Sequence, residues 1–344
     1  MAKISILFLF IVSLIVVLVN VFSGLWILPQ YFTLGPLTIH YYGITMALAV
    51  GSGWWLAVKR APKFGVDPAK ADGLLPWLVL GGFVGARAYH VASSWQYYVQ
   101  YPLDAFRVWH GGLSIFGALI GGIVVIVIYS RQFIFSSSPN NIGECVTGST
   151  LLKFSKTLSV SETETSPPKG EKTKEWSIAR RGTVRYNLQL LDWLAPSVLL
   201  GQIIGRFGNF FNYEAFGYPT NLPWKMLVPE GFRPMGFATS QYYHPLFLYE
   251  ALGNVVILVV LLNFYKSYKS YMTYRAYKSG TLFFMYLFLY NALRFGLEYL
   301  RVDSTFVYEI FRLNVLVSGL LCIFGLLGYL VVTYVLSTPK NELD

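Results

Sequence analysis

The feature that most constrains this chain is a series of apolar stretches, each long enough to cross a lipid bilayer. About 20 apolar residues of helix are needed to span the hydrocarbon core. Stretches of this kind run roughly at 4–28, 40–58, 73–92, 112–130, 189–205, 244–264, 280–300 and 306–335. The bilayer interior offers no hydrogen-bonding partners to the backbone. A segment that crosses it by itself must therefore form a helix, in which the backbone groups pair with one another. The sequence therefore predicts an all-α polytopic membrane protein with eight spans.

The composition supports a membrane location and limits the chemistry. Of the 344 residues, 55% are hydrophobic and 13% are charged, proportions that exclude a soluble domain of ordinary composition. The net charge of +10 must lie in the loops, where it attracts anionic lipid headgroups, and we expect no nucleic-acid partner. The two cysteines, Cys145 and Cys322, cannot build a disulfide framework or a zinc site. Any thiol chemistry would therefore use a cysteine of a partner. The sequence contains no metal-binding motif, and we expect no metal or other cofactor.

Basic residues predict which loops face the cytoplasm. They cluster in alternate loops, namely Lys59, Arg60 and Lys63, then 131–185, then Lys266, Lys269, Arg275 and Lys278, and finally Lys340. An excess of lysine and arginine marks the cytoplasmic side of a membrane protein. Both termini are then inside. The outer segments are 29–39, 93–111, 206–243 and the turn near 301–305.

The first apolar stretch has two interpretations. Preceded only by Lys3, it has the length of a signal-anchor helix, whereas a cleaved signal peptide would need a small-x-small site that is not obvious here. We expect the span to be retained. The predicted organisation is an anchor or extra helix at 1–30, a first part of the membrane core at 31–133, an insert at 134–186, a second part at 187–336 and a cytoplasmic tail at 337–344.

Two segments between the spans differ in composition. Residues 134–186 are rich in Ser, Thr, Lys and Glu and contain Pro167 and Pro168, so they cannot bury enough apolar surface to order themselves. This predicts a disordered cytoplasmic insert. Residues 206–243 instead interleave aromatic residues with Gly and Pro. That composition predicts a small external cap packed on the helices.

Ionisable residues inside or beside a span are costly, so each is a candidate functional residue. At the outer end of the fifth stretch, Arg206 and Asn209 are three residues apart and would share a helix face. On the seventh, Arg294, Glu298 and Arg301 have i, i+4, i+7 spacing and form one stripe. The stripe has two interpretations: a structural ladder of ion pairs, or a clamp for phosphate, whose oxygens suit the guanidinium fork.

Small residues in the third and fourth stretches have a simpler explanation. Gly117 and Gly121 have helical spacing, as do Gly81 and Gly85, and such pairs allow two helices to pack closely. Arg87, two residues after Gly85, adds a buried cation that needs an anionic partner.

Short motifs occur along the chain in a characteristic order. They are Tyr42-Gly43, Gly85-Ala86-Arg87, Gly111-Gly112-Leu113-Ser114, Gly205-Arg206-Phe207-Gly208-Asn209-Phe210-Phe211-Asn212-Tyr213-Glu214, His244-Pro245-Leu246-Phe247-Leu248-Tyr249-Glu250 and Arg294-Phe295-Gly296-Leu297-Glu298-Tyr299-Leu300-Arg301. Each motif alone is weak, since a tyrosine such as Tyr42 at the outer end of a span is usually a belt residue. As an ordered set, over roughly 36–132 and 187–335, they make the chain resemble the prolipoprotein diacylglyceryl transferase family. The resemblance implies a seven-helix core with an external cap, which leaves the first span as an extra helix.

The resemblance also implies roles for individual residues. Arg206 and Arg294 match the essential arginines that meet the lipid phosphate in this family, and Tyr42 matches the tyrosine of its first helix. The remaining candidate residues for binding phosphatidylglycerol are Arg87, Asn209, Glu214, Gly217, Glu298 and Arg301. In one place the chain departs from the family, because Phe116 stands where many relatives have a histidine proposed as a base. A phenyl ring takes no proton, so His110 is the nearest candidate base, and we expect that no histidine near Phe116 is required.

The activity implied is transfer of a diacylglyceryl group from phosphatidylglycerol to the lipobox cysteine of a prolipoprotein signal peptide. The thioether would form at the outer face of a bacterial cytoplasmic membrane, with release of glycerol 1-phosphate. One alternative is a transporter or an anionic-lipid-binding protein without chemistry, against which the lack of internal repeats argues. Another transferase acting on lipid headgroups would share the phosphate clamp but would not explain the ordered motifs.

Overall fold

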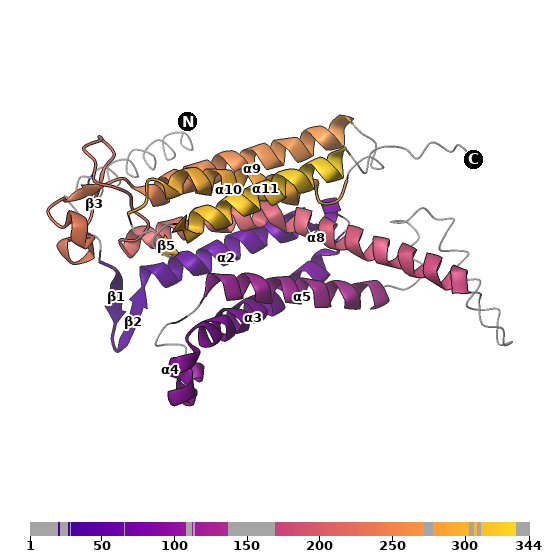
Figure 1. The fold of residues 1–344 in the computed structure, drawn as a ribbon, viewed down its shortest axis with the longest axis horizontal. Coiled ribbons are helices and arrows are strands. Elements are labelled where there is room, and N and C mark those ends of the chain that lie inside the picture. Colours follow the sequence, from indigo (N-terminus) through magenta and orange to yellow (C-terminus); the bar gives the residue numbers. More distant parts are fainter. Residues whose placement is uncertain are drawn as a thin grey trace, which may run out of the picture. The chain divides into compact units, whose positions relative to one another are not determined.

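The computed structural model is mostly helical (Figure 1). The residues it describes are 20, 27, 29–64, 66–107, 112, 114–136, 169–271, 278–302, 306–307 and 311–334. By their contacts they form two compact units. The first unit contains Met1–Lys59 and Leu191–Asp344, and the second contains Arg60–Leu190.

The helices follow the apolar stretches of the sequence. They are α2 (Tyr41–Arg60), α3 (Pro68–Ser93), α4 (Trp95–Gln100), α5 (Ile115–Ser136), α8 (Lys169–Phe211), α9 (Leu246–Tyr271), α10 (Thr281–Glu298) and α11 (Leu313–Thr333), with 3-10 turns η1 (Ala61–Phe64), η2 (Pro102–Phe106), η4 (Glu230–Phe232) and η5 (Met235–Phe237). Each predicted span from residue 40 onward falls on one of these helices. The first predicted span, 4–28, lies outside the described residues except for Asn20 and Ile27.

Three of the described helices are long and apolar enough to cross a membrane. They are Val184–Phe211, Leu246–Ser267 and Asn314–Thr333. Helix α10 does not meet this criterion, because Asn291, Arg294 and Glu298 lower the hydropathy of its 18 residues. The apolar helices are those of a membrane protein, as predicted, with three candidate spans where eight were expected.

The predicted insert, 134–186, is helical at both ends. Helix α5 continues to Ser136, and α8 begins at Lys169. Between Lys169 and Pro196 the sequence contains no proline and is rich in Lys, Glu, Ala and Arg, which favour helix. The structure differs from the predicted disorder at these two ends, and residues 137–168 lie outside the described residues.

In the first unit, α2 packs against α8 through glycines. A Cβ on Gly53 would lie 2.8 Å from the carbonyl oxygen of Ser197, and a Cβ on Gly201 would lie 3.2 Å from that of Ala49. The residue number falls on α2 as it rises on α8, so the two helices run antiparallel. Glycine permits the close backbone approach on which this packing depends.

A buried aspartate fixes the start of α10 to α8. Oδ2 of Asp192 accepts a hydrogen bond from the Gly280 amide at 2.6 Å, and Oδ1 accepts one from the Phe283 amide at 2.7 Å. These amides belong to the helix start, where N–H groups have no partner within the helix. Asp192 is completely buried, so the contact also neutralises the cost of burying polar backbone.

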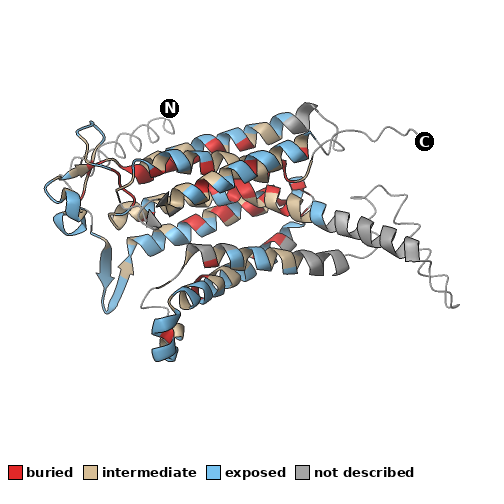
Figure 2. Cartoon of the chain, in the orientation of Figure 1, coloured by how far each residue is buried: buried red, intermediate tan, exposed pale blue. Residues whose placement is uncertain are grey.

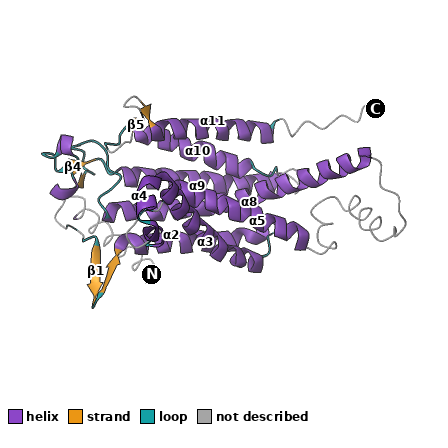
Figure 3. Cartoon of the chain, turned by 60° about the horizontal axis from the view of Figure 1, so that its bottom comes forward, coloured by secondary structure: helices purple, strands orange, loops and turns teal. Residues whose placement is uncertain are grey.

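Helices α9, α10 and α11 lie side by side (Figure 3). On α11, Gly325 and Gly328 face Phe288 and Phe284 of α10 so closely that a side chain at either glycine would collide with them. The outward faces of α9 and α11 carry exposed apolar residues such as Val256 and Leu320 (Figure 2). Such residues suit contact with lipid tails.

In the second unit, α3 and α5 pack through four glycines. Gly85 meets the backbone of Gly117 and Gly121, and Gly121 meets the backbone of Gly81, with no space for a Cβ at these contacts. The close packing predicted from their spacing is confirmed.

Short ladders connect the helices. The antiparallel pairs are β1 (Tyr31–Leu34) with β2 (Leu37–His40), β3 (Met226–Leu227) with β4 (Tyr242–Tyr243), and β5 (Phe306–Val307) with β6 (Phe311–Arg312). The first pair is closed by Gly35 and Pro36. Gly35 has φ +60°, which a tight two-residue hairpin requires at this position.

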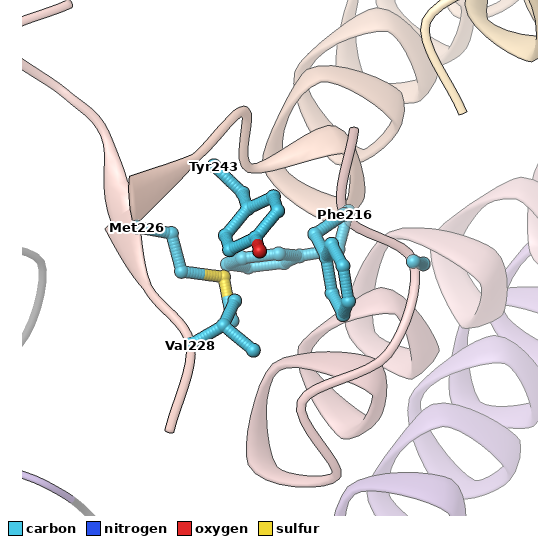
Figure 4. Packing of buried hydrophobic residues seen from close by; sticks show 6 residues of the cluster. Phe216, Met226, Val228 and Tyr243 are labelled. Carbon is cyan, nitrogen blue, oxygen red and sulfur yellow. The ribbon is translucent and has the colours of Figure 1, made fainter. Parts of the chain in front are cut away.

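The segment between α8 and α9 folds around a hydrophobic cluster (Figure 4). Its members are Ala215, Phe216, Met226, Val228, Tyr243 and Phe247. Among the aromatic residues predicted to pack in this segment, Tyr243 is fully buried and donates a hydrogen bond to the Phe237 carbonyl at 2.7 Å. Trp224 and Phe232 are exposed instead. The cluster fixes the loop to the start of α9.

Candidate active site

A single carboxylate in the first unit lies between two arginines from different helices. Oε1 of Glu250, in the first turns of α9, is 2.5 Å from Nη2 of Arg206 on α8. Its Oε2 is 2.8 Å from Nη1 of Arg294 on α10. The Glu250 side chain is 3% exposed, and those of Arg206 and Arg294 are 20% and 17% exposed. Charges this poorly solvated interact more strongly than at a surface, so one carboxylate ties three helices together.

Tyr290 completes the contacts of this carboxylate. Its hydroxyl donates a hydrogen bond to Oε1 of Glu250 at 3.2 Å and accepts one from Nη2 of Arg206 at 3.4 Å. Tyr290 lies four residues before Arg294 on α10, so both side chains share one face of that helix.

A second buried carboxylate lies one turn further along α10. Oε2 of Glu298, whose side chain is fully buried, is 3.3 Å from Nη2 of Arg294 and 3.8 Å from Nη1 of Arg301. Asn314 donates to Oε1 of Glu298 at 3.0 Å, and Arg312 donates to its backbone carbonyl at 2.8 Å. The stripe predicted from its spacing therefore forms a ladder of ion pairs. The ladder does not exclude a phosphate clamp, because Arg294 also faces Glu250.

The charged side chains of this cluster have a net positive charge, which a bound anion would neutralise. Arg206, Arg294 and Arg301 carry three positive charges against the two negative charges of Glu250 and Glu298, a balance of +1. The contacts of Arg206 use only Nη2, and its Nε and Nη1 have no protein partner among the described residues. A phosphodiester carries one negative charge and accepts the paired bonds that a guanidinium offers.

The signature residues after Arg206 gather at the end of α8. Nδ2 of Asn209 and of Asn212 each lie 3.4 Å from a carboxylate oxygen of Glu214. Tyr213 and Ala215 flank this glutamate with φ values of 54° and 55°, a left-handed conformation that is uncommon without glycine. The strained turn reverses the chain and returns the Glu214 carboxylate toward α8.

Gly217 connects this turn to the end of α10. Its amide donates to the His244 carbonyl at 2.8 Å, and it forms an isolated β-bridge with Arg301. A Cβ at this position would lie 2.6 Å from the Leu300 carbonyl oxygen and 3.0 Å from Cβ of His244. The turn therefore approaches the ion-pair ladder through a position that only glycine fits.

Gly217→Ala is expected to lower activity without preventing membrane insertion. The added methyl would push the turn away from Leu300 and so displace the chain beside Arg301. Steric changes of this size at a reacting site cost on the order of 10²-fold in rate. Gly236→Ala is the matched control, since a Cβ there meets nothing within 4 Å. Equal turnover of the two variants in the transfer assay described below would contradict the argument.

Tyr42 lies in the first turn of α2 and packs on α8. A Cβ on Gly208 would lie 2.9 Å from Cδ2 of the Tyr42 ring, so the glycine is the surface on which the ring rests. The hydroxyl lies within the electrostatic influence of Glu214 and Arg206. The structure thus brings Tyr42 to the same end of α8 as the arginine predicted to bind phosphate.

Arg87 belongs to the second unit. Its guanidinium donates to the carbonyl oxygens of Asp104 at 2.5 Å, Ala105 at 2.9 Å and Gly112 at 2.9 Å. These bonds hold the chain between α4 and α5 against α3. The described hydrogen bonds of Arg87 go to backbone carbonyls, which accept from a buried guanidinium readily, and the predicted anionic partner stays a prediction.

The structure does not test the role of the candidate base, His110. His110 and the side chain of Phe116 lie outside what the structure describes. Gly112 has φ +80°, and α5 begins only at Ile115, so the span predicted from residue 112 begins three residues later. The helix described here does not extend to His110.

Sequence reasoning gave no role to Glu250, Tyr290 or Asn314. For Glu250 a signal was available, because a carboxylate inside an apolar span is costly and calls for a partner. Tyr290 and Asn314 are ordinary residues of helices rich in aromatic and apolar side chains. Only the packing of α8, α9, α10 and α11 shows that they meet the charged residues.

Comparisons of the sequence with known proteins identify the family. The family model for prolipoprotein diacylglyceryl transferase matches residues 29–149 and 175–331. A protein of Synechococcus elongatus named phosphatidylglycerol--prolipoprotein diacylglyceryl transferase is 33% identical over 300 residues, which cover 87% of this chain and 86% of that protein. Proteins with the same name from Synechocystis sp. and Parasynechococcus marenigrum are each 34% identical over 87% of this chain, and the matches cover 87% and 92% of their own lengths. The ordered motifs, the arginines joined through Glu250 and the match along most of both chains lead to one conclusion: the chain belongs to the prolipoprotein diacylglyceryl transferase family.

Proposed function

We propose that this membrane enzyme transfers the diacylglyceryl group of phosphatidylglycerol to a cysteine thiol of prolipoproteins. The observation that carries the proposal is Glu250, held between Arg206 and Arg294 in a poorly solvated cluster of net charge +1. The relatives that match most of the chain bear the name of this activity. Binding an anionic lipid without chemistry would use the same arginines but would not account for that match.

In this reaction, negative charge develops on the phosphate group that the arginines bind. The cysteine sulfur attacks the carbon of the diacylated glycerol that is joined to the phosphate through oxygen. A carbon–sulfur bond forms there, and the bond between that carbon and the phosphate oxygen breaks. The bonding electrons pass to the phosphate oxygen, and glycerol 1-phosphate leaves with more negative charge than the diester had. Arg206 and Arg294 stabilise that developing charge, the term that is commonly largest in catalysis.

The thiol must lose its proton for the attack. The ordinary thiol pKa is about 8.5, and nearby cations lower it, so the same arginines increase the thiolate fraction. The proton passes to solvent. This account needs no histidine at the position of Phe116.

The contacts of the first unit support roles for most of the proposed substrate residues. Arg206, Arg294 and Arg301 bind the phosphate, while Glu298 fixes the last two in position through ion pairs. Asn209, Glu214 and Gly217 shape the chain that closes over the lipid, and Tyr42 supports the end of α8. Arg87, whose described contacts lie within the second unit, stays a predicted residue for binding phosphatidylglycerol.

The proposed architecture is a seven-helix core with an extra N-terminal span in the bacterial inner membrane. The end of α8, the start of α9 and the end of α10 meet at the charged cluster, and the basic loops at their other ends favour the cytoplasmic side. The active site then faces outward, beneath an external cap at 206–243. The rest of the insert 134–186 stays in the cytoplasm, away from the chemistry. The partner is a prolipoprotein signal peptide with a lipobox cysteine.

The purified protein is expected to attach diacylglycerol to a lipobox peptide in phosphatidylglycerol vesicles. Mass spectrometry of the peptide and enzymatic detection of released glycerol 1-phosphate measure the two products. A peptide with serine in place of cysteine should give neither product, because a hydroxyl is far less nucleophilic than a thiolate at neutral pH. Lipid binding without either product from the cysteine peptide would favour the binding protein over the enzyme.

A further inference from the structure

A second group of polar side chains lies beside the charged cluster, and the proposed reaction does not use them. We define the amide layer as Gln202 on α8, Asn254 on α9 and Tyr286 on α10. Nε2 of Gln202 donates a hydrogen bond to the Tyr286 hydroxyl at 3.1 Å. The contact of Arg206 with Tyr290 joins the same two helices. In both pairs the partners differ by 84 in residue number. The layer therefore lies one helical turn from the charged cluster, toward the start of α10.

Asn254 reaches the same level from α9. It lies four residues after Glu250 and so shares its helix face, and α9 runs opposite to α8 and α10. Gly253 packs on Leu293, so this part of α9 lies directly against α10. Asn254 is completely buried.

Three amide atoms of this layer lack protein partners among the described residues. Within the described part of the chain, neither Nδ2 nor Oδ1 of the buried Asn254 has a hydrogen bond, and Oε1 of Gln202 has none either. Buried polar atoms in native structures are almost always paired, so each such atom calls for an explanation. An apolar residue of the same branched shape, such as leucine at 254, would place no unpaired polar atom there. The amides therefore point to a ligand that supplies hydrogen bonds.

The chemistry of the layer selects the kind of ligand. Its groups are uncharged and include both donors and acceptors, as a hydroxyl group requires. Phosphate oxygens only accept, and acyl chains do neither. The headgroup of phosphatidylglycerol is a glycerol with two free hydroxyls beyond the phosphate, and one helical turn of about 5.4 Å separates the layer from the arginines.

We propose that Asn254, Gln202 and Tyr286 bind the hydroxyls of the glycerol headgroup while Arg206 and Arg294 hold the phosphate. This inference rests on the proposed function and assigns the selectivity for the donor lipid. A site built to pair with substrate hydroxyls rejects an analogue that lacks them, since its own buried groups are then left unpaired. Holding the glycerol also fixes the leaving group in line with the attacking sulfur.

The test compares two donor lipids in the purified full-length protein. Phosphatidylmethanol has the same phosphodiester charge as phosphatidylglycerol but no headgroup hydroxyl. The wild-type protein should prefer phosphatidylglycerol by about 10²-fold or more in kcat/KM. Asn254→Leu and Gln202→Met should each remove most of that preference, through a fall with phosphatidylglycerol and a change of no more than a few-fold with phosphatidylmethanol.

Stability gives an independent readout, because removal of an unpaired buried amide does not destabilise a protein. The melting temperature of Asn254→Leu should equal or exceed that of the wild type. Asn291→Leu is the matched control: this buried amide donates to the Leu287 carbonyl of its own helix at 2.7 Å, so its loss should lower stability and leave the donor preference intact.

Calorimetric binding of short-chain forms of both lipids makes the same comparison without turnover. An equal loss with both lipids would show that the layer holds water or supports the fold, and an unchanged preference would show that it binds nothing relevant; either result overturns the inference. Absence of transfer from both donors by the wild type would instead refute the proposed function, while the binding ratio would still decide the role of the layer.

Discussion

Arg294→Ala is expected to reduce diacylglyceryl transfer by about 10³-fold or more, and Arg206→Ala by a similar factor. Each change removes a poorly solvated guanidinium from the place where the phosphate gains charge. The other arginine still pairs with Glu250 in either variant, so the helices should stay together and the protein should insert normally. Initial rates with the lipobox peptide and phosphatidylglycerol measure the effect, and size-exclusion chromatography checks the fold.

Two further variants separate charge from geometry. Arg206→Lys keeps the charge but replaces a planar fork with a point charge, so it should recover little activity. Arg107→Ala removes an exposed arginine paired only three residues away with Asp104 and should leave the rate unchanged. Near-normal transfer by Arg206→Lys would rule out a bidentate contact with the phosphate, and retained activity in either alanine variant would remove that arginine from the mechanism.

Glu250→Gln is expected to lower kcat by about 10²-fold without raising KM for phosphatidylglycerol. The amide keeps the shape of the side chain but loses the charge that pulls Arg206 and Arg294 toward each other. The net charge of the cluster rises from +1 to +2 when this carboxylate is lost, so the anionic lipid is still attracted. The positions of the arginines that suit the leaving phosphate are lost. A purely structural role would instead lower stability and leave kcat per folded molecule intact.

The position of the carboxylate can be tested as well as its charge. Glu250→Asp retains the charge on a side chain shorter by one methylene, which cannot span both arginines, so it should also be impaired. Glu230→Gln is the control, because Glu230 is an exposed acidic residue in the segment between α8 and α9. Wild-type kcat in Glu250→Asp would show that the bridge between the two arginines is not needed.

Much of the fold followed from local properties of the sequence. Apolar length placed seven helices close to where they occur, and the spacing of Gly81, Gly85, Gly117 and Gly121 predicted their close packing. Apolar length and glycine spacing are properties of a single helix. The fixed period of a helix determines which residues share a face, so both can be predicted from sequence. The helical ends of the insert were missed, because a polar composition indicates exposure to solvent but does not exclude helix.

Partners of the candidate residues were harder to foresee. The sequence predicted no carbonyl partners for Arg87, and those that the fold gives it depend on how the chain between α4 and α5 turns. Turn geometry of this kind depends on residues distant in sequence. The left-handed conformations of Tyr213 and Ala215 illustrate the same point, since nothing in their side chains requires them.

The sequence by itself determined that the chain is a helical membrane protein and which family it belongs to, and it predicted which arginines meet a phosphate. Hydropathy, helical period and an ordered set of motifs carry that information, and each is read within one segment. Only the tertiary structure decided that Glu250 joins Arg206 to Arg294 and that Asn254, one turn away, has no hydrogen-bond partner within the described part of the chain. Which groups meet depends on the register and direction of three separate helices. That register is set by packing across the whole unit, so no single stretch of residues contains it.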